Sequence, residues 1–367
     1  MNPLHSSAQF PVNCWMVAAA SPSLHCEPLG VTICSKPIVL FRDAAGRVAA
    51  LEDRCVHRAA PLSLGRVEAG GLRCLYHGML FDSHGTCTEV PGQRSVPRSA
   101  CVRRYPVVER NGWIWVWPGK PEQADEALLP NAMAADHSGW ITAQSYLDFQ
   151  AHYSLLVDNL LDFSHLAFVH ANSFKADPKW ATLRPTISSI PRGLRVSRWI
   201  VDAPALASAR KCAGNKTDTW QSYDFLAPGI LLMETCYCHP GAAEAAAFGA
   251  PTEGVLVRNR AYQAVTPMTA RSSRYFFVAV LPAEEVERET CEHVLAVSRQ
   301  AFLEDKAMIE AQQQRIDDGP TWQPLALNAD RGIWQFHQIL AELTDSETAS
   351  IAQKAEVLMS GGPSQKS

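Results

Sequence analysis

Apolar and polar residues alternate along much of the first third of the chain, a pattern that predicts short β-strands. Residues 37–43 and 47–55 are apolar runs separated by the turn Ala-Ala-Gly, as expected for a hairpin. Trp113, Trp115 and Trp117 recur at every second position and predict a strand with one aromatic face. We expect this face to pack in a hydrophobic core.

The pattern changes after residues 117–130, where prolines and charges suggest a domain boundary. Beyond it, residues 146–170 predict a strand followed by a helix, and residues 183–282 are rich in strand-like runs. Residues 289–316 predict a long helix because they contain neither Gly nor Pro. We therefore expect an α+β protein with an all-β N-terminal domain. The expected divisions are residues 1–118, residues 119–350 and a disordered tail over residues 351–367.

Composition narrows the class of protein. The 367 residues are 47% hydrophobic and 19% charged, with a net charge of −4, which is ordinary for a soluble protein and gives no basic field for nucleic acid. Apolar stretches such as residues 275–283 are far shorter than the ~20 residues that span a bilayer. Eleven cysteines are too few for a disulfide scaffold. The first Lys or Arg is Lys36, so we expect no secretory signal peptide, which would begin with a basic segment. We expect a cytoplasmic protein without a membrane partner.

Two Cys/His pairs lie close together: Cys55 with His57, and Cys74 with His77. Two thiolates and two imidazoles can hold zinc, but zinc sites usually keep their cysteines together and their histidines together. Here each pair holds one Cys and one His, as a two-iron cluster with asymmetric ligation requires. This order favours a Rieske [2Fe–2S] centre, in which one iron takes both thiolates and the other both imidazoles.

A second candidate site lies in the predicted helix near residue 160. Asn159, Asp162 and His165 recur at every third position and share one helical sector, with His170 five residues later. On a continuous helix the two histidines would point about 140° apart. If both bind one metal, the helix must therefore end or bulge between them.

Two imidazoles leave a divalent iron short of negative charge, so we expect a carboxylate as the third ligand. On the long helix, Asp305 falls on an apolar face with Phe302 and Ile309, where an unpaired carboxylate is costly. Glu304 and Glu310 are expected to face solvent. Spacing alone favours Asp305 without excluding the other two.

These residues resemble those of a known family. The chain is similar, over about residues 12–345, to the oxygenase (alpha) component of Rieske non-heme iron aromatic-ring oxygenases, and most of all to the branch of vanillate O-demethylase, dicamba O-demethylase and toluenesulfonate methyl-monooxygenase. The likeness rests on six segments: NCWMVAA, CVHRAAPLSLG, CLYHGMLFD, PVVERNGWIWVWPG, LLVDNLLDFSHLAFVH and FLEDKAMIEAQQ.

The resemblance implies a Rieske domain followed by a helix-grip-like catalytic domain with an antiparallel sheet and flanking helices. It also implies that His165, His170 and Asp305 hold mononuclear Fe(II), with Asn159 beside the iron. In the family, subunits form head-to-tail homotrimers, and Asp162 would link one subunit's Rieske histidine to the His165 of the next. NADH would supply electrons through a separate reductase carrying flavin and a [2Fe–2S] cluster, with O2 as cosubstrate.

The resemblance further implies a monooxygenase that hydroxylates the methyl or methoxy group of a small, anionic aromatic acid. The sequence departs from relatives at His152 and Ser154, and at Gln263, where dicamba-type enzymes carry a substrate-contacting histidine. These departures bear on the substrate rather than the chemistry. Three alternatives remain: a ring-hydroxylating dioxygenase, a Rieske electron-transfer protein without its own catalysis, and a zinc-binding module.

Overall fold

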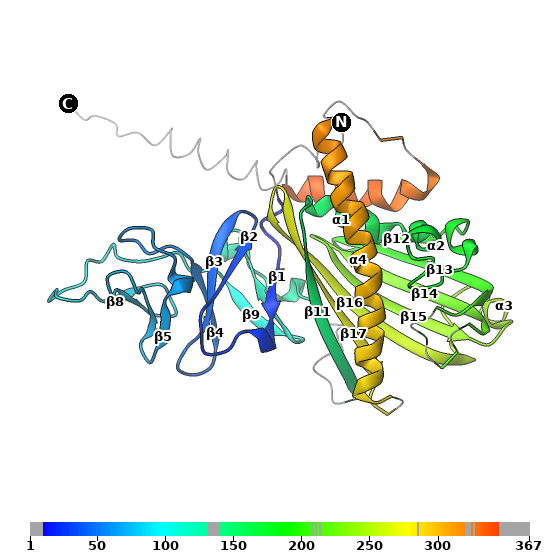
Figure 1. Ribbon diagram of the computed structural model, residues 1–367, viewed down its shortest axis with the longest axis horizontal. Coiled ribbons are helices and arrows are strands. Elements are labelled where there is room, and N and C mark those ends of the chain that lie inside the picture. The colour runs from blue at the N-terminus through cyan, green and yellow to red at the C-terminus, as the bar shows by residue number, and fades with distance from the viewer. Residues whose placement is uncertain are drawn as a thin grey trace, which may run out of the picture.

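The chain folds into two β-rich bodies joined side by side (Figure 1). The computed structural model describes residues 10–130, 139–206, 209, 211–212, 214–284, 286–319, 324–325 and 327–344. The predicted tail over residues 351–367 lies outside the described residues. No helix in the described part of the chain is both long enough and apolar enough to cross a membrane.

The N-terminal body consists of short antiparallel strands in three small sheets, ordered β1-β10-β9, β2-β3-β4 and β5-β6-β7-β8. The strands are β1 (Met16–Ala20), β2 (Leu29–Ile33), β3 (Lys36–Arg42), β4 (Val48–Glu52), β5 (Arg66–Glu68), β6 (Gly71–Arg73), β7 (Leu80–Phe81), β8 (Cys87–Glu89), β9 (Val107–Arg110) and β10 (Trp113–Val116). Single 3-10 turns lie at Ser21–Ser23, Leu62–Leu64, Pro121–Gln123 and Glu126–Leu128. The predicted hairpin is confirmed, because β3 and β4 pair from Ile38 opposite Glu52 to Arg42 opposite Val48.

The C-terminal body is built on one antiparallel sheet of order β11-β17-β16-β15-β14-β13-β12. Its strands are β11 (Trp140–Phe149), β12 (Thr186–Ile190), β13 (Gly193–Pro204), β14 (Lys216–Leu226), β15 (Ile230–Cys238), β16 (Val255–Thr269) and β17 (Ser272–Pro282). The helices are α1 (Tyr153–Leu161), α2 (Leu166–Val169), α3 (Ala242–Ala245) and α4 (Arg288–Asp318), with 3-10 turns η7 (Phe163–His165), η8 (Pro178–Ala181) and η9 (Asn328–Asp330). Residues 331–344 are also helical. The predicted α+β class is confirmed.

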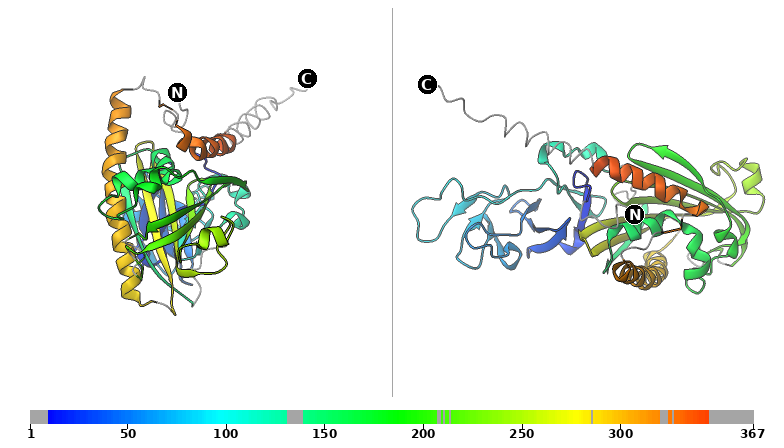
Figure 2. Two further views of the ribbon diagram at one scale, coloured as in Figure 1. Left: turned by 90° about the vertical axis from the view of Figure 1, so that its right-hand side faces the viewer. Right: turned by 90° about the horizontal axis from the view of Figure 1, so that it is seen from above.

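The long helix α4 lies across β11 and β17 (Figure 1; Figure 2, left). Phe302, Asp305 and Ile309 are buried at spacings of three and four residues, so they lie on one face of the helix. Phe302 meets Phe277 of β17 with ring centroids 4.9 Å apart. We call the side of the sheet that carries Phe277 the helix face and the opposite side the outer face.

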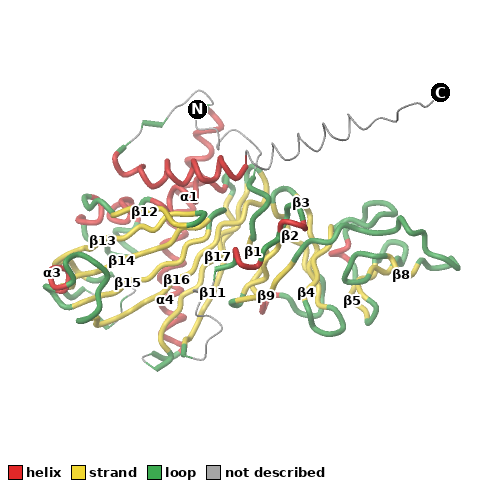
Figure 3. The backbone as a smooth tube through the Cα atoms, turned by 180° about the vertical axis from the view of Figure 1, so that it is seen from behind, coloured by secondary structure: helices red, strands yellow, loops and turns green. Residues whose placement is uncertain are grey.

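The predicted aromatic face of residues 113–117 is confirmed as core, and it joins the two bodies. Trp113 and Trp115 are fully buried and pack, with Trp15, against Tyr262 and Phe276. Tyr262 and Phe276 each adjoin, in sequence, a residue whose side chain is on the helix face. Their own side chains therefore lie on the outer face of the sheet. The N-terminal body therefore packs on part of the outer face, and Figure 3 shows β1 beside β16 and β17.

Candidate functional site

The first candidate site consists of two loops with the same backbone design. The carbonyl of Cys55 accepts a hydrogen bond from the backbone N–H of Ala59, and that of Cys74 accepts one from Gly78, both at 2.9 Å. Ala59 and Gly78 both adopt positive φ, at 54° and 75°. Each cysteine is thus followed four residues later by a left-handed residue, which turns the chain back around the sulfur atom.

The loops bring the two sequence-predicted Cys/His pairs together. Cys55 and Cys74 are 2% exposed, whereas His57 and His77 are exposed and their ring centroids lie 4.4 Å apart. Burial raises the pKa of the Cys55 thiol, and the adjacent Cys74 adds to this effect, so two thiolates here need a metal cation to be stable. A buried sulfur pair below an exposed imidazole pair fits the asymmetric ligation of a Rieske cluster.

The second candidate site unites residues that are far apart in the sequence. One ligand atom from each of His165, His170 and Asp305 lies within 4.8 Å of the other two. The Nε2 atoms of His165 and His170 are 3.5 and 3.2 Å from Oδ1 of Asp305. Cis ligands about 2.1 Å from one divalent ion lie about 3 Å apart, so this donor set fits a single metal ion in the 2-His-1-carboxylate arrangement.

The local backbone differs from the prediction. Asn159 lies in α1, but that helix ends at Leu161, so Asp162 does not share its helical sector. Asp162 is extended, at φ −119° and ψ 103°, and its carboxylate accepts hydrogen bonds from the N–H and hydroxyl of Ser164, both at 2.8 Å. The helix therefore breaks before His165, because Asp162 caps a new turn.

His165 and His170 flank the one-turn helix α2, and both ring orientations are set by their Nδ1 atoms. Nδ1 of His165 donates to the backbone carbonyl of Asp162 at 2.6 Å, and Nδ1 of His170 donates to Oε2 of Glu304 at 2.9 Å. Each Nε2 is then left with its lone pair, as a metal ligand requires. The contact between Asp162 and His165 runs through the main chain, not through the carboxylate.

The pKa values of the two imidazoles are shifted in opposite directions. Burial lowers the pKa of His165, and this effect outweighs the attraction of Asp305. Burial also disfavours the charged form of His170, but hydrogen bonds and charges from Asp305 and Glu304 together raise its pKa. The neighbouring carboxylates thus outweigh burial at His170 but not at His165.

Glu304 was expected to face solvent, and this expectation is wrong. Its Oε2 also accepts a hydrogen bond from the hydroxyl of Ser173 at 2.7 Å, so it lies directly behind His170. Glu310 likewise has partners, the backbone N–H of Gln150 and the ammonium of Lys306. Except for Lys306, these partners lie 131 to 160 residues away in the sequence, so helical spacing on α4 could not reveal them.

Three further residues from the sequence analysis are placed. Asn159 donates from Nδ2 to Oδ1 of Asp305 at 3.0 Å. His152 precedes α1 and accepts from the N–H of Ser154 through Nδ1, so it acts as a helix cap. Gln263 accepts a hydrogen bond from the hydroxyl of Tyr275 at 2.7 Å, and burial holds the pKa of Tyr275 well above its usual value.

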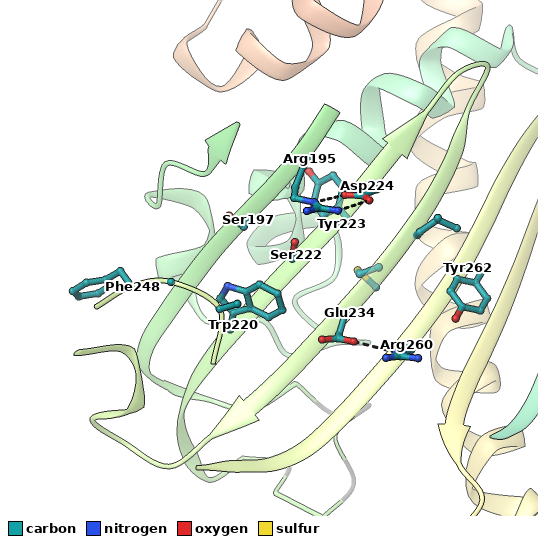
Figure 4. Close-up of a pocket in the computed structure, with 14 residues that line it drawn as sticks. Arg195, Ser197, Trp220, Ser222, Tyr223, Asp224, Glu234, Phe248, Arg260 and Tyr262 are labelled. Atoms are coloured by element: carbon teal, nitrogen blue, oxygen red, sulfur yellow. Dashed lines mark hydrogen bonds and ion pairs between the residues drawn. The ribbon is translucent and has the colours of Figure 1, made fainter. Parts of the chain in front are cut away.

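A cavity of about 650 Å³ lies elsewhere in the C-terminal body (Figure 4). It is lined by residues of β13 to β16 and by the segment 248–250. Its charged side chains are paired: Arg195 contacts Asp224 at 2.6 Å and Arg260 contacts Glu234 at 3.0 Å, as the dashed lines show. None of the three metal-site donors lines it.

Comparison with known families matches both bodies. Residues 14–106 match the Rieske [2Fe-2S] domain, and residues 149–346 match the vanillate O-demethylase oxygenase C-terminal domain. The second match alone covers more than half of the chain.

Similar proteins span nearly the whole chain. A putative toluene-4-sulfonate monooxygenase system iron-sulfur subunit from Comamonas testosteroni is 37% identical, covering 93% of this chain and 99% of the relative. A vanillate O-demethylase oxygenase subunit from Pseudomonas sp. (strain HR199 / DSM 7063) is 35% identical, covering 94% and 99%.

Solved structures agree. Dicamba monooxygenase bound to dicamba superposes with a TM-score of 0.84 at 30% identity, covering 93% of this chain and 99% of that one. A structure of the same enzyme with non-heme iron and dicamba superposes with a TM-score of 0.78 at 29% identity and the same coverage. The chain therefore belongs to the Rieske non-heme iron oxygenases, as an oxygenase component of the vanillate O-demethylase family that uses a Rieske [2Fe–2S] cluster, non-heme iron and O2.

Proposed function

We propose that this protein is a monooxygenase component that oxidises the methyl or methoxy carbon of a small aromatic acid. The convergence of His165 Nε2, His170 Nε2 and the Asp305 carboxylate within 4.8 Å carries the proposal. These three residues are assigned as the ligands of the mononuclear iron, which supplies O2 activation once bound. The substrate class comes from relatives that are named for toluene-4-sulfonate, vanillate and dicamba.

The Rieske cluster is assigned to the two matched loops. Cys55 and Cys74 would hold the inner iron and His57 and His77 the outer one, because the sulfur atoms are buried and the imidazoles exposed. The N-terminal body through residue 118 is proposed as the Rieske domain, and residues 119–350 as the catalytic domain.

The remaining residues of the site hold the ligands in place. Asn159 donates to Asp305 Oδ1 and so fixes the carboxylate that the metal would share. Glu304 accepts the Nδ1 proton of His170 and keeps that ring in the tautomer whose Nε2 can bind metal. Tyr275, Phe277 and Phe302 form a buried aromatic layer beside Asp305 that excludes water.

The proposed reaction balances with one O2, two electrons and two protons. One oxygen atom enters the methyl C–H bond and the other leaves as water. For an aryl methyl ether the resulting hemiacetal loses its proton and breaks its C–O bond, giving a phenol and formaldehyde. A benzylic methyl group would stop at the alcohol.

Electron transfer is proposed to run between chains in a homotrimer. The sheet β5–β8, next to the Cys/His loops, lies at the far end of the N-terminal body, whereas α1 and α2, next to the metal donors, lie in the C-terminal body (Figure 1). Around His57 and His77 the side chains of Val56, Leu75 and Tyr76 are exposed, as is Phe168 on α2. Contact between these apolar side chains of two copies would bring a cluster to the next chain's iron.

Asp162 is proposed as the carboxylate at that contact. Its side chain is partly exposed, and its backbone carbonyl already holds His165. The carboxylate can accept a hydrogen bond from the N–H of a Rieske imidazole of the neighbouring chain, while the backbone carbonyl of the same residue accepts one from His165. Asp162 would thus connect the two imidazoles through two hydrogen bonds. Electrons are proposed to arrive from NADH through a separate reductase with flavin and a [2Fe–2S] cluster, in the cytoplasm.

A panel of methoxylated and methylated aromatic acids tests the function. The holoenzyme, supplied with NADH and a surrogate reductase, is expected to release formaldehyde from methoxy acids or to form benzylic alcohols from methyl acids. Accumulation of cis-diols would instead make the protein a ring dioxygenase. Iron present only as [2Fe–2S] would leave an electron carrier without catalysis.

A further inference from the structure

Arg198 is a buried cation on the helix face of the sheet. It is 6% exposed and lies on β13 directly opposite Gln221 of β14. Gln221 and Tyr223 are two residues apart on β14, so their side chains share one face. The hydroxyl of Tyr223 donates to the carbonyl of Leu161 at the end of α1, which places this face toward the metal-site helices.

Most of the hydrogen-bonding capacity of Arg198 is unused within the described chain. Its guanidinium has five N–H donors, but its one hydrogen bond is from Nη2 to the hydroxyl oxygen of Tyr223 at 3.4 Å. Its Nε has no hydrogen-bond partner, and among the described residues no carboxylate forms an ion pair with it. Burying an unpaired charge is strongly destabilising, so we expect a bound group to supply the negative charge here.

Two aromatic rings hold the guanidinium in place. Its Cζ atom lies 5.4 Å from the ring centroid of Phe163, and that ring lies 4.9 Å from Tyr223. Burial raises the pKa of Tyr223 to about 12, so its hydroxyl stays neutral and oriented by Leu161. A cation fixed by aromatic contacts, with N–H groups to spare, is preorganised for an anion.

Arg198 is also close to the metal donors. Phe163, whose ring is 5.4 Å from Cζ of Arg198, has its ring centroid 6.5 Å from that of His165. Next to Arg198, Gln221 has a buried Oε1 without a partner, and its carboxamide can present either oxygen or nitrogen to a ligand. The two side chains thus form a polar subsite one aromatic ring away from the reacting centre.

We propose that Arg198, with Gln221 beside it, anchors the carboxylate or sulfonate of the aromatic substrate. The inference rests on the proposed function, because it assigns one end of the same substrate. The planar guanidinium matches either oxyanion through paired hydrogen bonds. With the acid group held at Arg198, the opposite end of the aromatic ring points back toward His165, His170 and Asp305.

Binding to the holoenzyme tests this assignment. Titration calorimetry at neutral pH would compare three probes: 4-methoxybenzoate, 4-methylbenzenesulfonate and the neutral 4-methoxybenzamide. We expect at least one anion to bind about 10- to 100-fold more tightly than the amide. The tighter anion identifies the headgroup. Equal affinity for all three probes would overturn the proposal.

Variants separate anchoring from packing. Arg198→Met should abolish the preference for the anion while leaving amide affinity unchanged, and Arg198→Lys should retain part of it. Arg195→Met is the matched control, because Arg195 lies on the same strand but on the outer face, paired with Asp224. An undiminished anion preference in Arg198→Met would show that Arg198 only packs.

Formaldehyde release from the neutral amide is measured in parallel. Turnover of the amide without any anion preference would reject the anchor and keep the monooxygenase function. Anion preference lost in Arg198→Met, without turnover of any methoxy probe, would keep the anchor and reject that function.

Discussion

Oε2 of Glu304 lies 2.9 Å from Nδ1 of His170, while Asp305, the next residue of α4, approaches Nε2 of the same ring at 3.2 Å. Consecutive carboxylates thus contact both nitrogens of one imidazole. The two contacts have different consequences, because only Nε2 faces the other metal donors. Glu304 acts on the metal through the ring, whereas Asp305 would bind it.

Replacing Glu304 by Ala should therefore weaken mononuclear iron binding without removing a ligand. We expect about a 10- to 100-fold loss of iron affinity, because His170 loses the acceptor that fixes its tautomer. Iron content measured against a competing chelator checks this. Glu292→Ala is the control, since Glu292 is an exposed carboxylate on the same helix. Equal iron retention in both variants would contradict the role of Glu304.

Replacing Asp305 by Ala should strip the mononuclear iron altogether. The visible and EPR spectra of the Rieske cluster should stay unchanged, because the cluster loops lie in the other body. Iron-to-protein stoichiometry by metal analysis gives the measurement. If the variant kept its full complement of iron, Asp305 would not be a ligand.

Replacing Asp162 by Asn tests the proposed bridge by removing charge alone. Asn can still cap the turn at Ser164, so the fold and both iron centres should be retained. Turnover should fall about 10- to 100-fold or more, because the link between a Rieske histidine and His165 loses its anion. Stopped-flow oxidation of the reduced cluster would report the step directly. A variant with unchanged rates would rule out the inter-chain route.

Gly78 is predicted to limit the stability of the cluster loop. Its φ is +75°, and an added Cβ would lie 2.8 Å from Cγ of Pro91. Gly92 has a similar φ of +79° with no neighbour within 4 Å, so Gly92→Ala carries the backbone strain alone, about 1–2 kcal/mol. Gly78→Ala should lose its visible cluster absorbance faster on heating than Gly92→Ala. Equal decay in both would show that the contact with Pro91 is relieved at no cost.

The elements that local pattern governs were predictable from the sequence. The β3–β4 hairpin, the buried tryptophans and the helix α4 all follow from periodicities of two or 3.6 residues, and the structure confirms them. The break before His165 was not predicted, because Asp162, Ser164 and their hydrogen bonds compete with helix continuation over only three residues. The spacing of apolar residues gives no sign of these competing hydrogen bonds.

By itself, the sequence determined the types and order of the residues proposed to bind metal. The Cys-x-His and Cys-x-x-His spacings, and the apolar face around Asp305, are local properties that short turns and helical geometry impose. Tertiary structure alone decided which distant groups meet. Glu304 reaches His170 across 134 residues, and Arg198 faces the metal-site helices because of how β13 pairs in the sheet. Such contacts depend on how whole helices and strands pack together. That packing is decided by many small free-energy contributions, from burial and hydrogen bonds, spread over the entire chain.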